Sequence, residues 1–284
     1  MIVVKPTVTP GGGLFGPRSI TWRVHTETPA WPAAVRAFQL QALHPRTIRG
    51  IVQNHLLDDA EAVRAHLRRR LGFVALRTFG TREQAEAAYE RAREVHARLV
   101  GLDTATGTLF RLDEPESLRW AHCAEVASHL EVARLSGVAL TAGERDAYVA
   151  EQRRAAYLAG LAGLTDVPDS AGELADHLTG MRAHLSATDE ARELLRLVVT
   201  PPPSLRPCTL PAVGALAFAT LPGWARSMYG CPGDAAAGYA AGAALKALRA
   251  TAMAMPERLV APEIRAARAL MRAAARTRGA DVAA

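Results

Sequence analysis

The chain has 284 residues, of which 49% are hydrophobic and 22% charged, and this composition is typical of a folded globular domain. Aromatic residues make up only 5%, while alanine, leucine and arginine recur, which favours helices and disfavours a β-sandwich or barrel. The formal net charge is +6, but the basic residues are spread along the chain and form no known nucleic-acid-binding motif. We therefore predict an all-α fold, a single-domain multi-helix bundle, with no nucleic-acid partner.

Cysteine usage and apolar runs indicate the compartment. Cys123, Cys208 and Cys231 lack a C-x-x-C spacing and are odd in number, which supports neither a disulfide framework nor a zinc site. The apolar stretch at residues 1–4 is too short for a signal peptide. The uncharged run at residues 207–225 is interrupted by prolines and glycines, so a buried segment is the better interpretation. We expect a cytoplasmic protein with no membrane span.

The first predicted elements are an arm and two helices. Residues 1–13 form an N-terminal arm or loop, and residues 14–284 form the single helical domain. The three glycines at residues 11–13 are not a phosphate-binding loop, because no strand precedes them and no Lys-Ser or Lys-Thr follows. The apolar spacing over residues 32–54 predicts two helices with a turn at Pro45.

Longer helices follow in the middle of the chain. Asp58 and Asp59 predict the start of a helix that ends at Gly80, and Thr81 starts an amphipathic helix that reaches about Val100. Further helices are expected over residues 115–135, 141–161, 173–185 and 188–198.

The last third contains one predicted connector. Residues 200–211 are proline-rich and are predicted to be an ordered, non-helical connector. Residues 212–284 are rich in alanine and are predicted to be helical except near residues 230–233. No repeat of fixed period is present, which argues against a solenoid.

Histidines offer the clearest chemistry. His96 follows Arg93 by three residues, a spacing that places both side chains on one helix face. Neutral imidazole is the commonest axial ligand of haem, although a lone helical histidine is more often part of the core or surface. His122 and His129 are separated by seven residues, about 10 Å along a helix at roughly 1.5 Å per residue, which is too far to share one metal ion.

Hydrolytic chemistry has little support in the sequence. The chain has no H-E-x-x-H, no G-x-S-x-G and no cysteine in a familiar catalytic context. Glu125, Asp58 and Asp59 are candidate acids or bases if they face a pocket, and the aspartates also suit helix caps. The residues by themselves predict a helical bundle with histidine and arginine available to line a cavity.

Two phrases at the start of the chain resemble a known family. Residues 16–25 read GPRSITWRVH and residues 36–45 read RAFQLQALHP. With later matches in the same order, they resemble the MpaB-type oxygenases and latex clearing protein over about residues 14–232. The later matches are Phe79-Gly80 with Thr81, the His96 phrase that ends in Val100-Gly101, Trp120-Ala121-His122, Leu221-Pro222 with Arg226, and Tyr229-Gly230.

The resemblance implies an all-helical fold that holds haem b between helices and uses dioxygen, in the best-known member to cleave a polyisoprene double bond. By motif, His96 matches the proximal ligand of the haem iron, and Arg93 matches a nearby arginine of the haem pocket. Apolar helices around such a site would keep water away from reactive oxygen species.

The chain departs from the family beside the implied haem. Before Phe-Gly the family usually carries R-L-x-R-T, and this chain has His66 in place of the first arginine and Arg70 in place of the threonine. Arg69 matches the second arginine of this family phrase. Two adjacent cations in a dry pocket are costly unless an anion pairs with them, so we expect the site to favour an anionic ligand.

Three functional hypotheses follow. The first is a haem-dependent oxygenase of secondary metabolism that acts on a small metabolite, with His96 on the iron and His66 or Arg70 touching dioxygen or substrate. The second is a haem-free relative in which Arg69 and Arg70 bind an anionic metabolite, or displace an anionic leaving group in a cyclisation, with Asp59, Asp58 or Glu125 as base. The third is an interaction subunit whose partner protein supplies the chemistry.

Overall fold

The computed structural model describes residues 5–161, 167–200, 210–232 and 235–283, and these form thirteen α-helices and one two-stranded antiparallel sheet. The predicted all-α fold is therefore confirmed. In chain order the elements are α1 (Ile20–Glu27), α2 (Ala30–Gln41), α3 (Pro45–Gln53), α4 (Ala60–Phe79), α5 (Arg82–Arg98), β1 (Val100–Asp103), β2 (Thr108–Arg111), α6 (Pro115–Leu135), α7 (Ala142–Leu158), α8 (Ala171–Gly180), α9 (Asp189–Val199), α10 (Leu210–Ala219), α11 (Gly223–Met228), α12 (Ala235–Ala254) and α13 (Pro262–Ala283).

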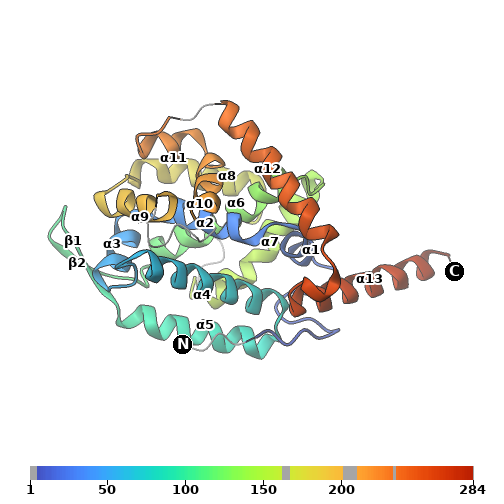
Figure 1. Cartoon of the computed structure of the whole chain (residues 1–284). Helices are drawn as coiled ribbons and strands as arrows, with labels where there is room; N and C mark the ends of the chain where they lie inside the picture. Colours follow the sequence, from blue (N-terminus) through green and yellow to red (C-terminus); the bar gives the residue numbers. More distant parts are fainter. Residues whose placement is uncertain (1–4, 162–166, 201–209, 233–234, 284) are drawn as a thin grey trace.

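Helix α2 lies in the middle of the bundle, packed against α6, α10 and α4 (Figure 1). Its residues from Pro32 onwards are all buried, and Val35, Phe38 and Leu40 belong to the largest core cluster. That cluster also draws residues from α3, α4, α6, α9, α10 and α11, so burial of one helix holds most of the bundle together.

The polar side chains of α2 connect it to its neighbours. Arg36 Nη1 donates a hydrogen bond to Ser128 Oγ at 2.8 Å, and Arg36 Nε donates to the Thr220 carbonyl at 3.2 Å. Gln41 Nε2 donates to the Ala121 carbonyl at 2.7 Å. Because buried polar groups need partners, these residues fix how α6 and the end of α10 pack on α2. The RAFQLQALHP phrase therefore has a structural role.

Helices α4 and α5, which pack against each other, begin where their caps predict. Asp59 Oδ1 accepts a hydrogen bond from the Ala62 amide at 2.8 Å at the start of α4, and Gly80 follows its last residue. Thr81 and Gln84 form a capping box at the start of α5. These caps fix where α4 and α5 begin, and these two helices carry most of the predicted site residues.

A β-hairpin follows α5, where the sequence predicts helix up to Val100. The helix ends at Arg98, and β1 pairs with β2 so that Gly101 lies opposite Phe110. A Cβ atom on Gly101 would come within 2.4 Å of Phe110 Cζ, so glycine is required for this ring to lie across the strand. The prediction was wrong here because a four-residue strand has too little periodicity to be recognised.

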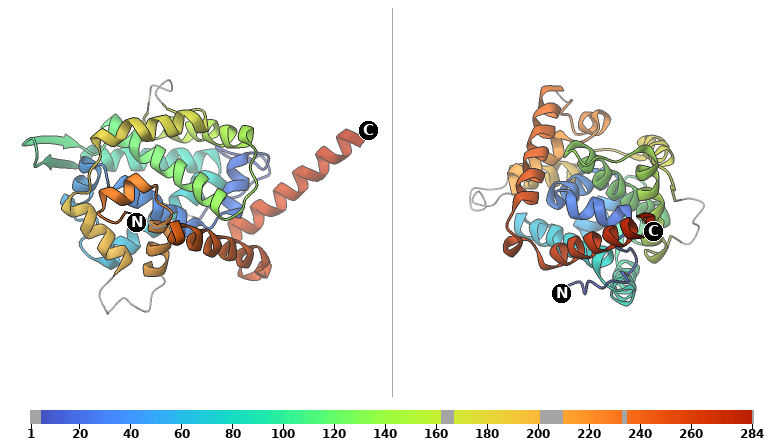
Figure 2. Two further views of the ribbon diagram at one scale, coloured as in Figure 1. Left: turned by 90° about the horizontal axis from the view of Figure 1, so that it is seen from above. Right: turned by 90° about the vertical axis from the view of Figure 1, so that its right-hand side faces the viewer.

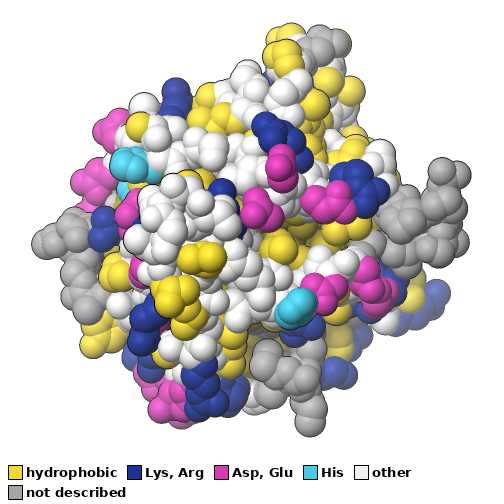
Figure 3. All heavy atoms as spheres, turned by 90° about the vertical axis from the view of Figure 1, so that its left-hand side faces the viewer, with side chains coloured by type: hydrophobic (Ala, Val, Ile, Leu, Met, Phe, Trp, Pro, Cys, Tyr) yellow, Lys and Arg dark blue, Asp and Glu magenta, His cyan; other side chains and the backbone are white. Residues whose placement is uncertain are grey.

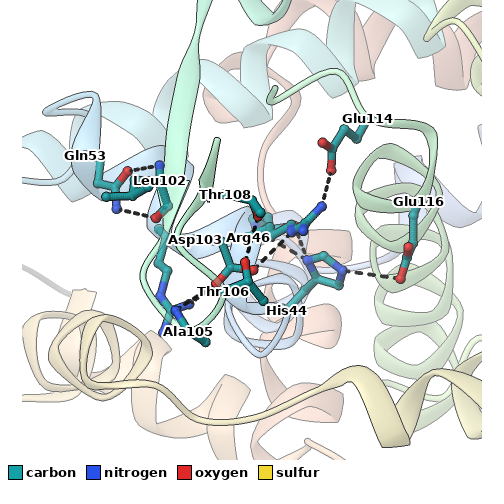
Figure 4. Close-up of polar contacts among 12 residues, drawn as sticks. His44, Arg46, Gln53, Leu102, Asp103, Ala105, Thr106, Thr108, Glu114 and Glu116 are labelled. Atoms are coloured by element: carbon teal, nitrogen blue, oxygen red, sulfur yellow. Dashed lines mark hydrogen bonds and ion pairs between the residues drawn. The ribbon is translucent and has the colours of Figure 1, made fainter. Parts of the chain in front are cut away.

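A buried carboxylate fastens the hairpin to α3 (Figure 4). Asp103 accepts hydrogen bonds from Arg46 Nε at 3.2 Å and from Arg49 Nη1 at 2.8 Å. The side-chain amide of Gln53 bonds to both the amide and the carbonyl of Leu102, so it serves as a substitute strand neighbour. On the face that carries the hairpin, basic and acidic side chains are interspersed (Figure 3).

The second half of the chain differs from the prediction at several boundaries. Helix α8 ends at Gly180 and continues as a short 3₁₀ helix, Met181–His184. Residues 201–209 of the predicted connector lie outside the described residues, but α10 begins at Leu210 and includes Pro211. The prediction that the connector is non-helical up to residue 211 was therefore wrong at its end. Proline is tolerated in the first turn of a helix, because the amide hydrogen that it lacks would have no partner within the helix there.

The C-terminal region is less continuous than predicted. A break at residues 255–261, with a 3₁₀ turn at Glu257–Leu259, separates α12 from α13. The far end of α13 extends away from the bundle, on the side opposite the hairpin (Figure 2). Within the described ranges, no helix combines the length and the apolar character needed to cross a membrane.

Candidate functional site

Helices α4 and α5 bring two of the predicted site residues together. The His66 ring on α4 stacks against Phe38 with ring centroids 5.0 Å apart. Burial lowers the pKa of His66 to about 3, with further contributions from Arg70, Arg69 and His96. His66 Nε2 is buried and has no hydrogen-bond partner among the described residues. The ring is therefore neutral at neutral pH and holds an unused nitrogen.

His96 lies in the last turn of α5 and is half-buried. Burial and the charge of Arg70 lower its pKa, while Asp113 opposes the shift. A neutral imidazole is the form that binds a metal ion. The structure thus brings His96 and His66 into electrostatic contact, with Arg70 acting on both.

Behind these histidines, one carboxylate joins α4 to α6. Arg70 Nη2 donates to Glu125 Oε2 at 3.1 Å, and Arg77 Nη2 donates to Glu125 Oε1. Arg77 also donates to Tyr89 Oη on α5 at 3.3 Å. Arg70 and Arg77 lie two helical turns apart on α4, so both reach the same carboxylate. We call Arg70, Arg77 and Glu125 the ion triad.

The ion triad keeps its charges despite burial. Burial would raise the pKa of Glu125, but Arg77 and Arg70 outweigh it and lower the pKa to about 2. Burial would likewise lower the pKa of Arg77, but Glu125 and Tyr89 outweigh it and raise that pKa. Glu125 is therefore a carboxylate under all physiological conditions. A base this weak is poorly suited to proton abstraction, which counts against Glu125 in the predicted role of base.

Two stacked imidazoles lie on the inner side of the ion triad. His129, one turn after Glu125 on α6, stacks on His25 of α1 with ring centroids 4.4 Å apart. His25 hydrogen-bonds Tyr148 Oη at 3.1 Å and Thr78 Oγ1 at 3.3 Å. Both ring nitrogens of His129 are buried without a partner in the described part of the chain. Burial lowers the pKa of His129 to about 4, so the ring is neutral.

Two predicted residues lie in other surroundings, and a third, Arg69, is near His66 without a polar partner among the described residues. Asp59 is exposed and caps α4, at the far end of the helix from Arg77. Arg93 is exposed and donates to the Leu158 carbonyl at the end of α7, so it does not share the surroundings of His96. Arg69 is half-buried and lowers the pKa of His66, but no hydrogen bond or ion pair joins it to the described residues. Asp59 and Arg93 are thus not brought to the site.

Arg77, Tyr89, His25 and Tyr148 were not predicted as part of the site. Their side chains meet because α1, α4, α5, α6 and α7 converge there, and no local spacing records that convergence. The one available signal was the i, i+4 spacing of Glu125 and His129, which places both on one face of α6.

Two open clefts on the surface are lined by residues other than histidine. The larger encloses about 540 Å³ beside Arg18, Glu151 and Arg154. The smaller encloses about 290 Å³ beside Gln84 and Arg91. In the part of the chain that the structure describes, no group of three or more histidine, cysteine, aspartate or glutamate side chains is arranged to hold a metal ion.

Comparison with known proteins shows which protein family the sequence around these residues matches. The sequence profile described as "ER-bound oxygenase mpaB/B'/Rubber oxygenase, catalytic domain" matches residues 22–254, most of the chain. The match includes the ion triad and two histidine pairs, His66 with His96 and His25 with His129. It confirms the resemblance that the sequence phrases indicate. No curated protein and no solved structure matches the chain.

Proposed function

The chain belongs to the family of mpaB/B' and rubber oxygenase catalytic domains, and we propose on this basis that it is a haem-dependent oxygenase acting on a small, anionic metabolite. The family is oxygenase-related, which supports an oxidoreductase. The observation that carries the proposal is the pairing of two neutral histidines, His66 and His96, on adjacent helices beside the ion triad.

The donor set suits the iron of haem b. His96 has a lowered pKa and would hold the haem iron, as the motif resemblance implies. The unpartnered Nε2 of His66 is the kind of buried polar atom that a bound group or substrate would satisfy. When bound, haem b supplies the activation of dioxygen, which the amino acids of the chain cannot provide.

The protein's own residues would bind and orient the substrate. Arg69 has a guanidinium without an ionic partner in the described ranges, which suits a carboxylate or phosphate group of a substrate. The ion triad holds Arg70 against α6 and keeps that cation next to His66 and His96. Phe38, which stacks on His66 and belongs to the largest core cluster, would keep water from that side of the ring.

The absorbance spectrum of the full-length protein tests this function. Protein expressed with added haem precursor should show a Soret band and a pyridine haemochrome spectrum of haem b. His96→Ala should lose the Soret band, or shift it. His184→Ala, which removes an exposed histidine, should keep the wild-type spectrum. Absence of a Soret band from the wild-type protein, even after addition of haem, would overturn the proposal.

One observation favours a second function, a haem-free relative that binds an anionic metabolite or stabilises an anionic leaving group. Arg70 and Arg77 share the single carboxylate Glu125, and Arg69, which acts on His66, has no ionic partner among the described residues. If the protein shows no Soret band, calorimetric titration with pyrophosphate tests this second function. Arg69→Gln should then weaken binding by about 1–3 kcal/mol, the usual cost of a lost charged hydrogen bond. A dissociation constant that does not change would exclude this use of the site. Activity seen only with an added protein would instead support a partner subunit.

A further inference from the structure

The larger surface cleft is a separate place where the chain presents unused positive charge. Its walls come from the N-terminal segment at Pro10 and residues 16–19, from Glu151 and Arg154 on α7, and from Ala274 on α13. Figure 1 shows the N-terminal segment passing close to α13. The cleft is open to solvent and has a volume of about 540 Å³, which is room for a ligand of metabolite size. It shares no residue with the ion triad or the two histidine pairs.

Two guanidiniums dominate the charge of this cleft. Arg18 is exposed and forms no hydrogen bond or ion pair with the described residues. Arg154 uses Nη1 to donate to the Leu14 carbonyl at 3.1 Å, which fixes the side chain and leaves its other donors available. A planar guanidinium matches the oxygen spacing of a phosphate or carboxylate, so two of them in one cleft favour an oxyanion.

The carboxylate in the cleft, Glu151, already accepts hydrogen bonds from α1. Glu151 Oε2 accepts hydrogen bonds from the Thr21 amide at 2.8 Å and from Thr21 Oγ1 at 2.7 Å. Glu151 Oε1 accepts from the Ile20 amide at 3.1 Å. These bonds place the negative charge against the first turn of α1, where the helix dipole stabilises it. The positive charge of Arg18 and Arg154 therefore remains for a ligand.

We propose that this cleft binds a small phosphorylated molecule, with Arg18 and Arg154 holding the phosphate and Pro17 and Ala274 flanking its carbon skeleton. The N-terminal and α13 walls lie outside residues 22–254, the part that matches the oxygenase family. The terminal segments thus supply Arg18 and the α13 wall, and Arg154 comes from within the matched part. The cleft does not depend on whether the family site holds haem.

Isothermal titration of the full-length protein with phenyl phosphate, at constant ionic strength, tests the proposal. The wild-type protein should bind one molecule, and inorganic phosphate should compete. Arg18→Gln and Arg154→Gln should each weaken binding at least about 5-fold, since a charged hydrogen bond is lost. Arg192→Gln removes the same charge at an exposed site on α9 and should change binding less than 2-fold.

A variant on the opposite wall gives an independent check. Ala274→Glu introduces a carboxylate on α13 and should abolish binding without removing a hydrogen bond. Saturable binding that persists in both Arg18→Gln and Ala274→Glu would overturn the proposal, as would no binding to the wild-type protein. Vesicles containing phosphatidic acid form a further arm. Binding to these vesicles without binding to phenyl phosphate would also overturn it, because the ligand would then be a lipid surface.

Discussion

Glu125 is the residue on which the charges of the site depend. Replacing it with glutamine would leave Arg70 and the buried Arg77 without their shared anion. Removing one partner of a buried ion pair costs about 3 kcal/mol, because the remaining charge is left unpaired in a poorly solvated place. We expect Glu125→Gln to lower the free energy of unfolding in urea at pH 7 by about that amount.

The matched control for this variant lies on α9. Glu193→Gln removes a carboxylate that pairs with Arg196, and both side chains are more than half exposed, so the pair contributes little. Its urea midpoint should stay near that of the wild-type protein. Equal effects of the two substitutions would show that the ion triad has no special importance for stability.

His129 should make stability depend on pH. Its pKa in the folded protein is about 4, against 6.5 for an unperturbed histidine, so the folded state binds fewer protons than the unfolded state between these values. Stability is fully present above pH 6.5 and falls as the pH decreases towards 4. By pH 5 this one ring should have cost about 2 kcal/mol.

Urea denaturation at pH 7 and pH 5 measures that loss. His129→Gln should lose less free energy of unfolding between the two pH values than the wild-type protein does. The comparison within each protein cancels the cost of the substitution itself, which is the same at both pH values. An unchanged pH dependence would contradict the assigned role of burial at His129.

At the scale of elements, sequence patterns predicted helices well where caps or prolines mark their ends. Asp59 and Gly80 bound α4, and Pro115 begins α6, because these residues act on the backbone next to them. The hairpin at residues 100–111 was missed because its strands are too short to show a period, and the contacts of Asp103 with α3 join parts distant in sequence. Helix α1 was also not predicted, although Ser19 caps it, and Glu151 of α7 accepts from its first two amides.

The N-terminal segment is held by close backbone contact, which a single methyl group should disturb. A Cβ atom on Gly13 would lie 1.9 Å from the Gly80 carbonyl oxygen, and both backbones would have to shift. We expect Gly13→Ala to lower the free energy of unfolding by about 1–3 kcal/mol, the usual cost of overpacking. Urea denaturation followed by circular dichroism measures it.

A neighbouring glycine supplies the control. A Cβ atom on Gly11 would meet no heavy atom within 4 Å. Gly11→Ala should therefore keep the wild-type stability or raise it slightly, because alanine restricts the unfolded chain. If both alanine variants behave alike, the contact between Gly13 and Gly80 does not hold the segment.

At the scale of the whole molecule, residues 14–284 are predicted to form a single domain. Trp120 lies in the largest core cluster, whereas Trp22 lies in a second cluster with Phe79 and Tyr89. The Trp22 indole donates to the Thr78 carbonyl at 2.8 Å, and α4 contributes to both clusters. We expect the Trp22→Phe variant to unfold with the same midpoint by fluorescence as by circular dichroism, and we expect the same agreement for the Trp120→Phe variant. Separate fluorescence and dichroism midpoints within either variant would show two units.

The amino-acid sequence by itself determined the all-α class, most helix boundaries and the family, because composition, caps and local phrases act over a few residues. It also identified His66, Arg70 and His96 as neighbours of one site. Only the tertiary structure decided which side chains complete that site. Arg77 and Glu125 pair across α4 and α6, His129 stacks on His25 from α1, and Asp59 and Arg93 turn to other surroundings. Such meetings depend on how distant helices pack around α2, and packing of that kind leaves no periodic signal in the chain.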